Sequence, residues 1–120
     1  GDGVVIPRAG SWEWYDHLFN CDGELLNICW YYSALRFARF MGQELGITAH
    51  DAFIATRMEA IERVFEARYW KAKEGYFSSS CFADDRANAM AVLAGLCQKE
   101  KYPFPRCQWG ICSTRSLETS

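Results

Sequence analysis

The sequence predicts an all-α fold of long antiparallel helices, and three observations carry this prediction. Two long stretches place apolar side chains at intervals of three and four residues, which is the spacing of one helical face. A third stretch repeats small apolar residues at the same interval. Glycine or proline residues follow each stretch, and the first connection is short, so the first two helices are expected to form a hairpin.

The 120 residues are expected to form a single partial domain in three parts. Residues 1–21 form an irregular N-terminal segment, because glycine and proline interrupt any periodicity there. Residues 22–101 carry three helices, and residues 102–120 form an irregular tail. Half of the residues are hydrophobic, which is typical of an ordered globular chain and excludes a disordered one.

The first helix is expected from Asp22 to about Leu45. Asn20, Cys21 or Asp22 can cap its start, and Gly46 is placed to end it in a left-handed conformation. The apolar residues at helical spacing are Leu25, Ile28, Cys29, Tyr32, Leu35 and Phe40. Other apolar residues widen this arc beyond one stripe: Trp30, Tyr31, Phe37 and Met41. We interpret Trp30-Tyr31-Tyr32 as core packing, and a helix this apolar needs neighbours on several sides.

The second helix is expected to begin at a Thr48 cap, with Asp51 three residues later in a near capping box. It is expected to end between Trp70 and Lys73, followed by a turn at Glu74-Gly75. Residues 76–83 are then predicted to be a connection rich in serine and aromatic residues.

The third helix is expected from Asp84 or Asp85 to about Lys101, before two prolines that forbid continuation. Its packing face consists of small or flexible residues: Ala87, Met90, Ala91, Ala94 and Cys97. Because the first two helices form a hairpin, the third runs roughly parallel to the first. The two helix starts therefore share one end of the bundle, which places Asp16 and Asp22 near Asp84 and Asp85.

The charge pattern favours neither a nucleic-acid partner nor a membrane. The formal net charge is −2, and the lysines and arginines are scattered without a basic run. The most apolar stretch, residues 25–41, is interrupted by two arginines and two polar residues, which a membrane-spanning helix would not tolerate.

The six cysteines do not indicate a disulfide framework or a metal site. Cys29 and Cys97 lie within apolar helical patterns, where a free thiol behaves as a small hydrophobic group. No C-x-x-C pair occurs, so zinc binding is not expected. Cys107 and Cys112 flank a short turn and are the pair to test for a bond. No cofactor is expected.

The segment from Trp12 to Asp22 combines aromatic rings with carboxylates. Rings pack on the apolar face of a sugar, and carboxylates accept hydrogen bonds from its hydroxyl groups. Trp12, Trp14 and Asp16 are therefore candidate sugar contacts. Structural anchoring is an equally weighted alternative for the two tryptophans, and helix capping is a nearly equal alternative for Asp16.

The acidic residues at the helix starts favour a different role. Asp22, Asp84 and Asp85 are interpreted first as helix caps, because aspartate is a preferred capping residue. Arg86 is expected to pair with a nearby carboxylate.

Two segments carry specific motifs. The first contains Trp12-x-Trp14-x-Asp16, Asn20-x-Asp22, Asn27 and Trp30-Tyr31-Tyr32-x-Ala34-Leu35. The second reads Asp84-Asp85-Arg86-Ala87-Asn88-Ala89-Met90-Ala91-Val92-Leu93-Ala94-Gly95-Leu96. Together they resemble the catalytic domain of bacterial α-L-rhamnosidases, glycoside hydrolase family 78, over about residues 11–97.

The resemblance implies a part of an (α/α)6 toroid that cleaves terminal α-L-rhamnosides with inversion, a reaction that uses two separated carboxyl groups. In the family, the acid precedes and the base follows the matching region, so no catalytic residue is assigned here. The implied substrate contacts are Trp14, Asp16, Trp12 and Asp85. One departure is that Asp16-His17-Leu18 stands where many relatives have Asp-Trp-Gly. A periplasmic or secreted parent protein is also implied.

Two hypotheses of function follow. The first is a fragment of a rhamnosidase-like hydrolase, inactive alone, with a rhamnoside as the partner of the full-length protein. The second is a non-catalytic helical interaction module that binds a partner or itself through an exposed apolar face. Residues 118–120 resemble the lead-in to a further capped helix, which predicts a piece of a larger protein or a strongly associating subunit.

Overall fold

Three helices dominate the computed structural model, which describes residue 5, residues 21–98 and residue 100. Helix α1 spans Gly23–Leu45, α2 spans Asp51–Tyr69 and α3 spans Asp85–Ala94. Two short strands, β1 (Trp70–Lys71) and β2 (Tyr76–Phe77), lie between α2 and α3. The described part of the chain is mostly helical, which confirms the predicted all-α class at this coarse level.

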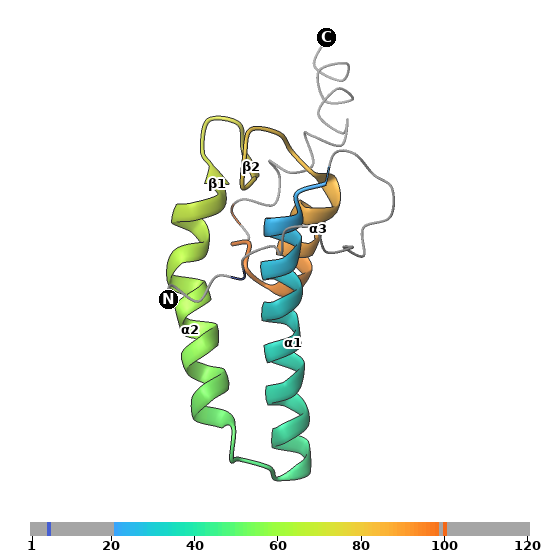
Figure 1. Cartoon of the computed structure of the whole chain (residues 1–120), viewed down its shortest axis with the longest axis vertical. Helices are drawn as coiled ribbons and strands as arrows, with labels where there is room; N and C mark the ends of the chain where they lie inside the picture. Colours follow the sequence, from blue (N-terminus) through green and yellow to red (C-terminus); the bar gives the residue numbers. More distant parts are fainter. Residues whose placement is uncertain (1–4, 6–20, 99, 101–120) are drawn as a thin grey trace.

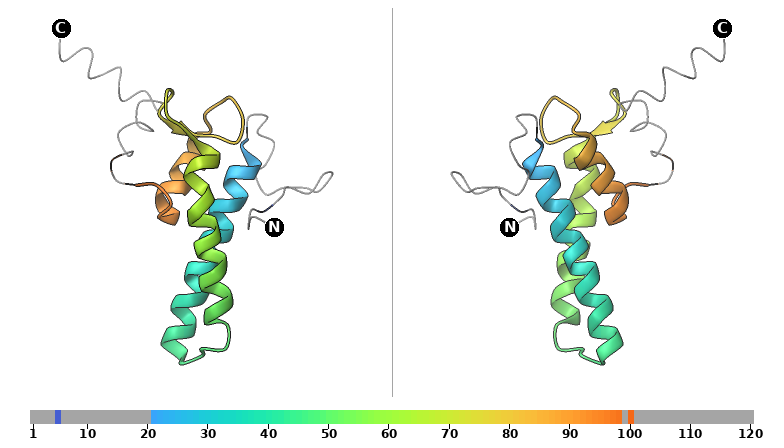
Figure 2. Two further views of the ribbon diagram at one scale, coloured as in Figure 1. Left: turned by 90° about the vertical axis from the view of Figure 1, so that its left-hand side faces the viewer. Right: turned by 90° about the vertical axis from the view of Figure 1, so that its right-hand side faces the viewer.

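Helices α1 and α2 lie side by side along the long axis of the molecule, and the chain turns back between them at residues 46–50 (Figure 1). The short helix α3 packs beside the N-terminal half of α1, as both side views also show (Figure 2). The C-terminal half of α1 therefore extends past α3 and has α2 as its helical neighbour within the described residues.

The core lies where the three helices and the strand pair meet. Its aromatic centre consists of Phe65, Tyr69 and Phe77, with ring centroids 5.2 Å apart for the first pair and 5.3 Å apart for Phe65 and Phe77. Trp70 adds a fourth ring, 4.8 Å from that of Phe77. These separations and the tilted ring planes are favourable for aromatic pairs. The end of α2 and the strand pair are thus packed as one unit.

Small side chains bring α3 close to its neighbours. Ala87, Ala91 and Ala94 are completely buried, and Met90 packs against the same core. Cys97 is also buried, although it lies after the helix. The predicted packing face of the third helix is therefore confirmed.

Helix α1 has the predicted limits. The side chain of Asp22 accepts a hydrogen bond from the Leu25 N–H at its start, and Gly46 adopts φ +69° at its end. The interpretation of its apolar arc was partly wrong. Tyr32 is buried and Tyr31 packs against the core, but Trp30 and Phe40 are 55% and 59% exposed, because no described element covers their side of the helix.

The other two helices depart from the predicted limits. The start of α2 is capped by His50 without a side-chain hydrogen bond, while Thr48 offers its carbonyl oxygen to the Asp51 N–H at 3.1 Å. The predicted Thr48 cap was therefore wrong. Helix α3 ends at Ala94 and not near Lys101, because Gly95 adopts φ +84° and its N–H bonds back to the last turn.

The strand pair was not predicted. Trp70 lies opposite Phe77 and Lys71 opposite Tyr76 in antiparallel register. Gly75, with φ +76°, lies in the connecting turn, so the predicted turn at Glu74-Gly75 is confirmed. The pairing directs the chain from the end of α2 back across the core to the start of α3.

We predict that alanine substitutions at the two helix-ending glycines differ in cost. Gly46→Ala is expected to lower the free energy of unfolding by about 1–2 kcal/mol, because the left-handed conformation is strained but the added Cβ meets nothing within 4 Å. Gly95→Ala is expected to cost about 1 kcal/mol more. Its Cβ would lie 3.0 Å from Arg36 Nη1, which donates to the Ala94 carbonyl.

Urea denaturation followed by circular dichroism measures both losses. Gly46→Ala is the matched control, since it carries the same change at a left-handed helix end with open space. Equal losses for the two variants would contradict the role assigned to Arg36.

Candidate functional site

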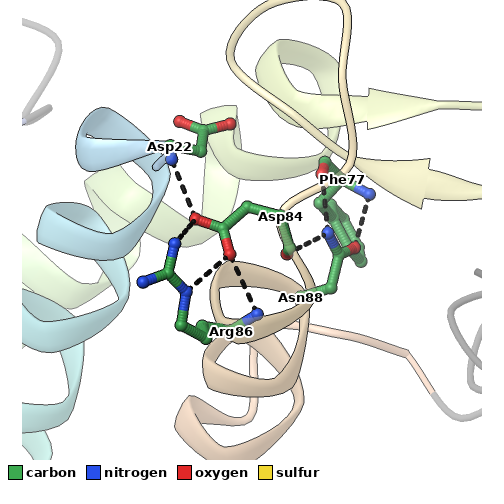
Figure 3. A network of polar contacts seen from close by, with 5 residues as sticks. All are labelled: Asp22, Phe77, Asp84, Arg86 and Asn88. Atoms are coloured by element: carbon green, nitrogen blue, oxygen red, sulfur yellow. Dashed lines mark hydrogen bonds and ion pairs between the residues drawn. The ribbon is translucent and has the colours of Figure 1, made fainter. Parts of the chain in front are cut away.

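The starts of α1 and α3 meet at one end of the structure. The Asp22 N–H donates to Asp84 Oδ2 at 2.9 Å, although the two residues are 62 positions apart in the chain (Figure 3). The prediction that Asp22 and Asp84 lie close together at one end of the bundle is therefore confirmed. This end, formed by the starts of α1 and α3, is here called the rim. Asp16, the third residue placed there from sequence, lies outside the described residues.

The Asp22 carboxylate is buried, and both of its oxygens accept hydrogen bonds from other groups of the protein. Oδ1 accepts from the Leu25 N–H at 3.1 Å, which is the capping bond of α1. Oδ2 accepts from the Ser79 N–H at 2.7 Å, and the Ser79 hydroxyl donates to Oδ1. Asp22 thus confirms its predicted capping role and also fixes the loop before α3 to the start of α1.

The Asp84 carboxylate holds the start of α3 in the same way. Its Oδ1 accepts from the Arg86 backbone N–H at 3.0 Å and from Arg86 Nε at 3.1 Å, and its Oδ2 accepts from Nη2 at 3.2 Å. This two-pronged pairing confirms the expected partner of Arg86. Burial acts to raise the pKa of Asp84, but the Asp22 N–H and Arg86 outweigh it and hold the pKa below 3.8.

Asn88 joins α3 to β2 and was not assigned a role from sequence. Its Oδ1 accepts from the Phe77 N–H at 2.7 Å, and its Nδ2 donates to the Phe77 carbonyl at 2.9 Å. Nδ2 also reaches the Asp84 carbonyl at 3.0 Å. The signal that could have identified Asn88 is its position beside Ala87 and Ala91 on a face that is otherwise apolar.

A second polar link joins α1 to the end of α2. Glu24 Oε1 accepts from Arg68 Nη2 and from the Tyr69 hydroxyl, each at 3.0 Å. Burial and the hydrogen bond to Glu24 raise the pKa of Tyr69 well above its usual value, so its hydroxyl remains a donor at physiological pH. Sequence reasoning missed this link because its members are more than forty residues apart.

Of the four predicted sugar contacts, one lies in the described part of the chain. Asp85 is the first residue of α3 and is exposed at the rim, next to the buried Asp84. Trp12, Trp14 and Asp16 lie outside the described residues. Asp85 does not cap the helix, since that role belongs to Asp84.

The described residues contain no group of three or more His, Cys, Asp or Glu side chains that could hold a metal ion. Burial, followed by the charge of Asp22, raises the pKa of Cys29 to about 12, so its thiol is a packing group and not a nucleophile. No disulfide joins the four cysteines of this part of the chain, and the Cys107–Cys112 pair lies outside it. No helix of the described part is long and apolar enough to cross a membrane.

Comparison of the chain with protein-family models, with curated proteins and with solved structures finds no match.

We predict that Asp22→Ala lowers the free energy of unfolding by about 2–4 kcal/mol, because it removes the α1 cap and the acceptor of two Ser79 bonds. Ser79→Ala is expected to cost about 1 kcal/mol, and the double variant less than the sum of the two. Urea denaturation of the wild type and all three variants gives the free energies of unfolding for this double-mutant cycle. Asp85→Ala is the control carboxylate at the same rim, with an expected loss below about 1 kcal/mol. Additive losses would show that Asp22 and Ser79 are not coupled.

We predict an acid-sensitive contribution from Asp84. Its native pKa lies below the unfolded value near 3.8, so its stabilisation is present above that pH and is lost as the pH falls through the native pKa. Asp84→Asn should therefore unfold at lower urea concentration near neutral pH and show a flatter decline in stability as the pH falls below about 4. Denaturation midpoints measured across this range test the prediction. Parallel pH profiles for the two proteins would contradict it.

Proposed function

We propose that this chain is a segment of an (α/α)6 toroid from a glycoside hydrolase that removes terminal α-L-rhamnosyl groups with inversion. In this proposal the chain supplies substrate contacts at the rim of the barrel, and the general acid and base come from outside it. The proposal starts from the two motif segments, which resemble the same catalytic domain.

The observation that carries the proposal is the direct contact between the two motif segments. Asp22 belongs to the first motif and Asp84 to the second, and the 2.9 Å hydrogen bond between them joins the starts of α1 and α3. Asn88, also from the second motif, holds the preceding loop in place. Asp22, Asp84 and Asn88, three residues of the two motifs, thus take part in building this rim.

The environments of Asp22 and Asp84 argue against a catalytic role for either residue. An inverting glycosidase needs one carboxyl group that protonates the leaving oxygen and one that activates water. Asp22 and Asp84 are buried, and backbone N–H groups, Ser79 and Arg86 occupy their oxygens. A low pKa also makes Asp84 a poor proton donor. Their role is to shape the rim.

The substrate contacts in the proposal are Trp14, Asp16, Trp12 and Asp85. The indole rings would stack on the apolar face of the sugar ring, and the carboxylates would accept hydrogen bonds from its hydroxyl groups. Asp85 is exposed beside the buried pair and has room for such a contact.

A second candidate function is a non-catalytic helical interaction module. It is favoured by the large apolar side chains that α1 exposes, including Phe37 at 68% and Met41 at 58%. This function requires no sugar and no further domain.

We predict that the longer protein containing this chain hydrolyses an aryl α-L-rhamnoside and that the 120-residue chain alone does not. Aryl β-glucoside and β-glucuronide serve as comparison substrates. Within the active protein, Asp85→Asn is expected to raise KM about tenfold, because a sugar hydroxyl loses its charged acceptor. Asp51→Asn is the matched control, since it also changes the first residue of a helix but lies at the start of α2.

Turnover of no glycoside by the longer protein would overturn the hydrolase proposal and leave the interaction module. Turnover with equal KM for Asp85→Asn and the wild type would remove Asp85 from the substrate contacts.

A further inference from the structure

A regular stripe of side chains runs along the face of α1 that lies away from the core. It consists of Trp30, Ala34, Phe37 and Met41, here called the α1 stripe, and its spacings of four, three and four residues are those of a coiled-coil seam. All four residues are exposed, with values of 55%, 68% and 58% for Trp30, Phe37 and Met41. The core residues of α1, such as Tyr32 and Leu35, occupy the other side.

The positions that flank the α1 stripe carry no charge. They are Tyr31, Ser33, Ala38 and Phe40. The charged residues of this stretch, Arg36 and Arg39, stand at positions outside the stripe and its flanks. Arg36 lines the hollow beside the stripe, where its guanidinium donates to the Ala94 carbonyl oxygen. At the stripe and its flanking positions, a second copy of the same face would meet no like charge, which favours a two-fold contact between identical surfaces.

The exposed apolar area matches the requirement of a dimer. The aromatic side chains of Trp30, Phe37 and Phe40 have about 200 Å² of surface each and are exposed by 55–68%. Together they contribute roughly 350 Å² of exposed apolar surface. Met41 and the adjacent Leu93, exposed by 58% and 73%, raise this to roughly 550–600 Å². A standard interface buries about 800 Å² on each partner, of which about 450–520 Å² is apolar. The exposed apolar side chains of this face therefore supply the apolar share of a standard interface.

We propose that two copies of this chain pair through their α1 stripes, with the helices antiparallel about a two-fold axis between Ala34 and Phe37. This inference rests on the interaction-module function, for which it names a second copy of the chain as the partner, and it is independent of the hydrolase proposal. The axis places Ala34 opposite Phe37 of the second copy and Trp30 opposite Met41 of the second copy. Each large ring then faces a smaller or flexible side chain, which lets the two helices approach closely.

A hollow beside the stripe supports the same arrangement. It has a volume of about 400 Å³ and is lined by Ser33, Arg36, Phe37, Phe40 and Leu93. The proposed axis brings Phe40 of the second copy over Ser33. Its ring would fill the hollow against Leu93, and the symmetric contact would fill the other hollow.

The polar residues at the two ends of the stripe set the register. The next positions of the seam are Asn27, three residues before Trp30, and Glu44, three residues after Met41. The proposed axis brings Asn27 opposite Glu44 of the second copy. A shift by one heptad would instead bring a polar residue against an apolar one, at a cost in desolvation.

The test is the mass of the 120-residue chain by sedimentation equilibrium over a range of concentrations. We expect a monomer–dimer equilibrium that reaches twice the 13.8 kDa of one chain, with a dissociation constant in the micromolar range or lower. Phe37→Glu is expected to weaken the dimer by more than about tenfold, because it would bury an unpaired charge at the interface. Phe53→Glu is the matched control, since Phe53 is 57% exposed but lies on α2.

A mixing experiment tests the register. Ala34→Lys and Phe37→Glu should each dimerise poorly alone, while their mixture should recover at least about tenfold in affinity, because the axis places the new lysine opposite the new glutamate. Ala67→Lys, on the exposed side of α2, replaces Ala34→Lys in the control mixture and should give no recovery.

A monomer at all concentrations would overturn the proposal. The proposal would also fail if another segment of the chain or a different partner covered the stripe. A dimer disrupted by Phe53→Glu and not by Phe37→Glu would also overturn it. The outcome is independent of the glycosidase assay, since it measures mass and not turnover. Circular dichroism of each variant separates loss of pairing from loss of folding.

Discussion

The backbone N–H and the carboxylate of Asp22 connect three segments that are far apart in the sequence. The N–H is bound by Asp84 at the start of α3, and the carboxylate binds the first turn of α1 and the loop at Ser79. A buried carboxylate is costly unless its oxygens are satisfied, so this residue is stable only when all three segments are in place. The fold at this end of the molecule therefore forms as one unit, with Asp22 at its centre.

The position of α3 depends on this polar network more than on apolar burial. Its contact face is built from Ala87, Ala91 and Ala94, which remove little apolar area from water compared with the large side chains of α1 and α2. Alanines permit close approach but specify no single rotation of the helix. The bonds of Asn88 to Phe77, and of Asp84 to Asp22, have definite directions and fix that rotation. The described part of the chain leaves no buried side-chain nitrogen or oxygen without a partner.

The sequence predicted the features that depend on neighbouring residues and missed those that depend on distant ones. The Asp22 cap, the glycine end of α1 and the Arg86–Asp84 pair are local, so the residue types indicate them. The early end of α3 at Gly95 was missed because the residues that follow also favour a helix. The strand pair and the Asn88 bridge arise from tertiary contacts that no local pattern encodes. Helical periodicity predicted α1 but could not tell which of its apolar faces is covered, so Trp30 was wrongly placed in the core.

The rim and the α1 stripe lie at different places on α1. The stripe begins at Trp30, about two turns beyond Asp22, and the polar residue Asn27 lies between them. In the proposed pair, residues 27–44 of the two helices overlap, so the start of α1 projects beyond the contact. With a rise of 1.5 Å per residue, the two Asp22 positions would be roughly 40 Å apart along the paired helices. Each rim, with its exposed Asp85, would remain open at opposite ends of the dimer, so pairing would not block a ligand at either one.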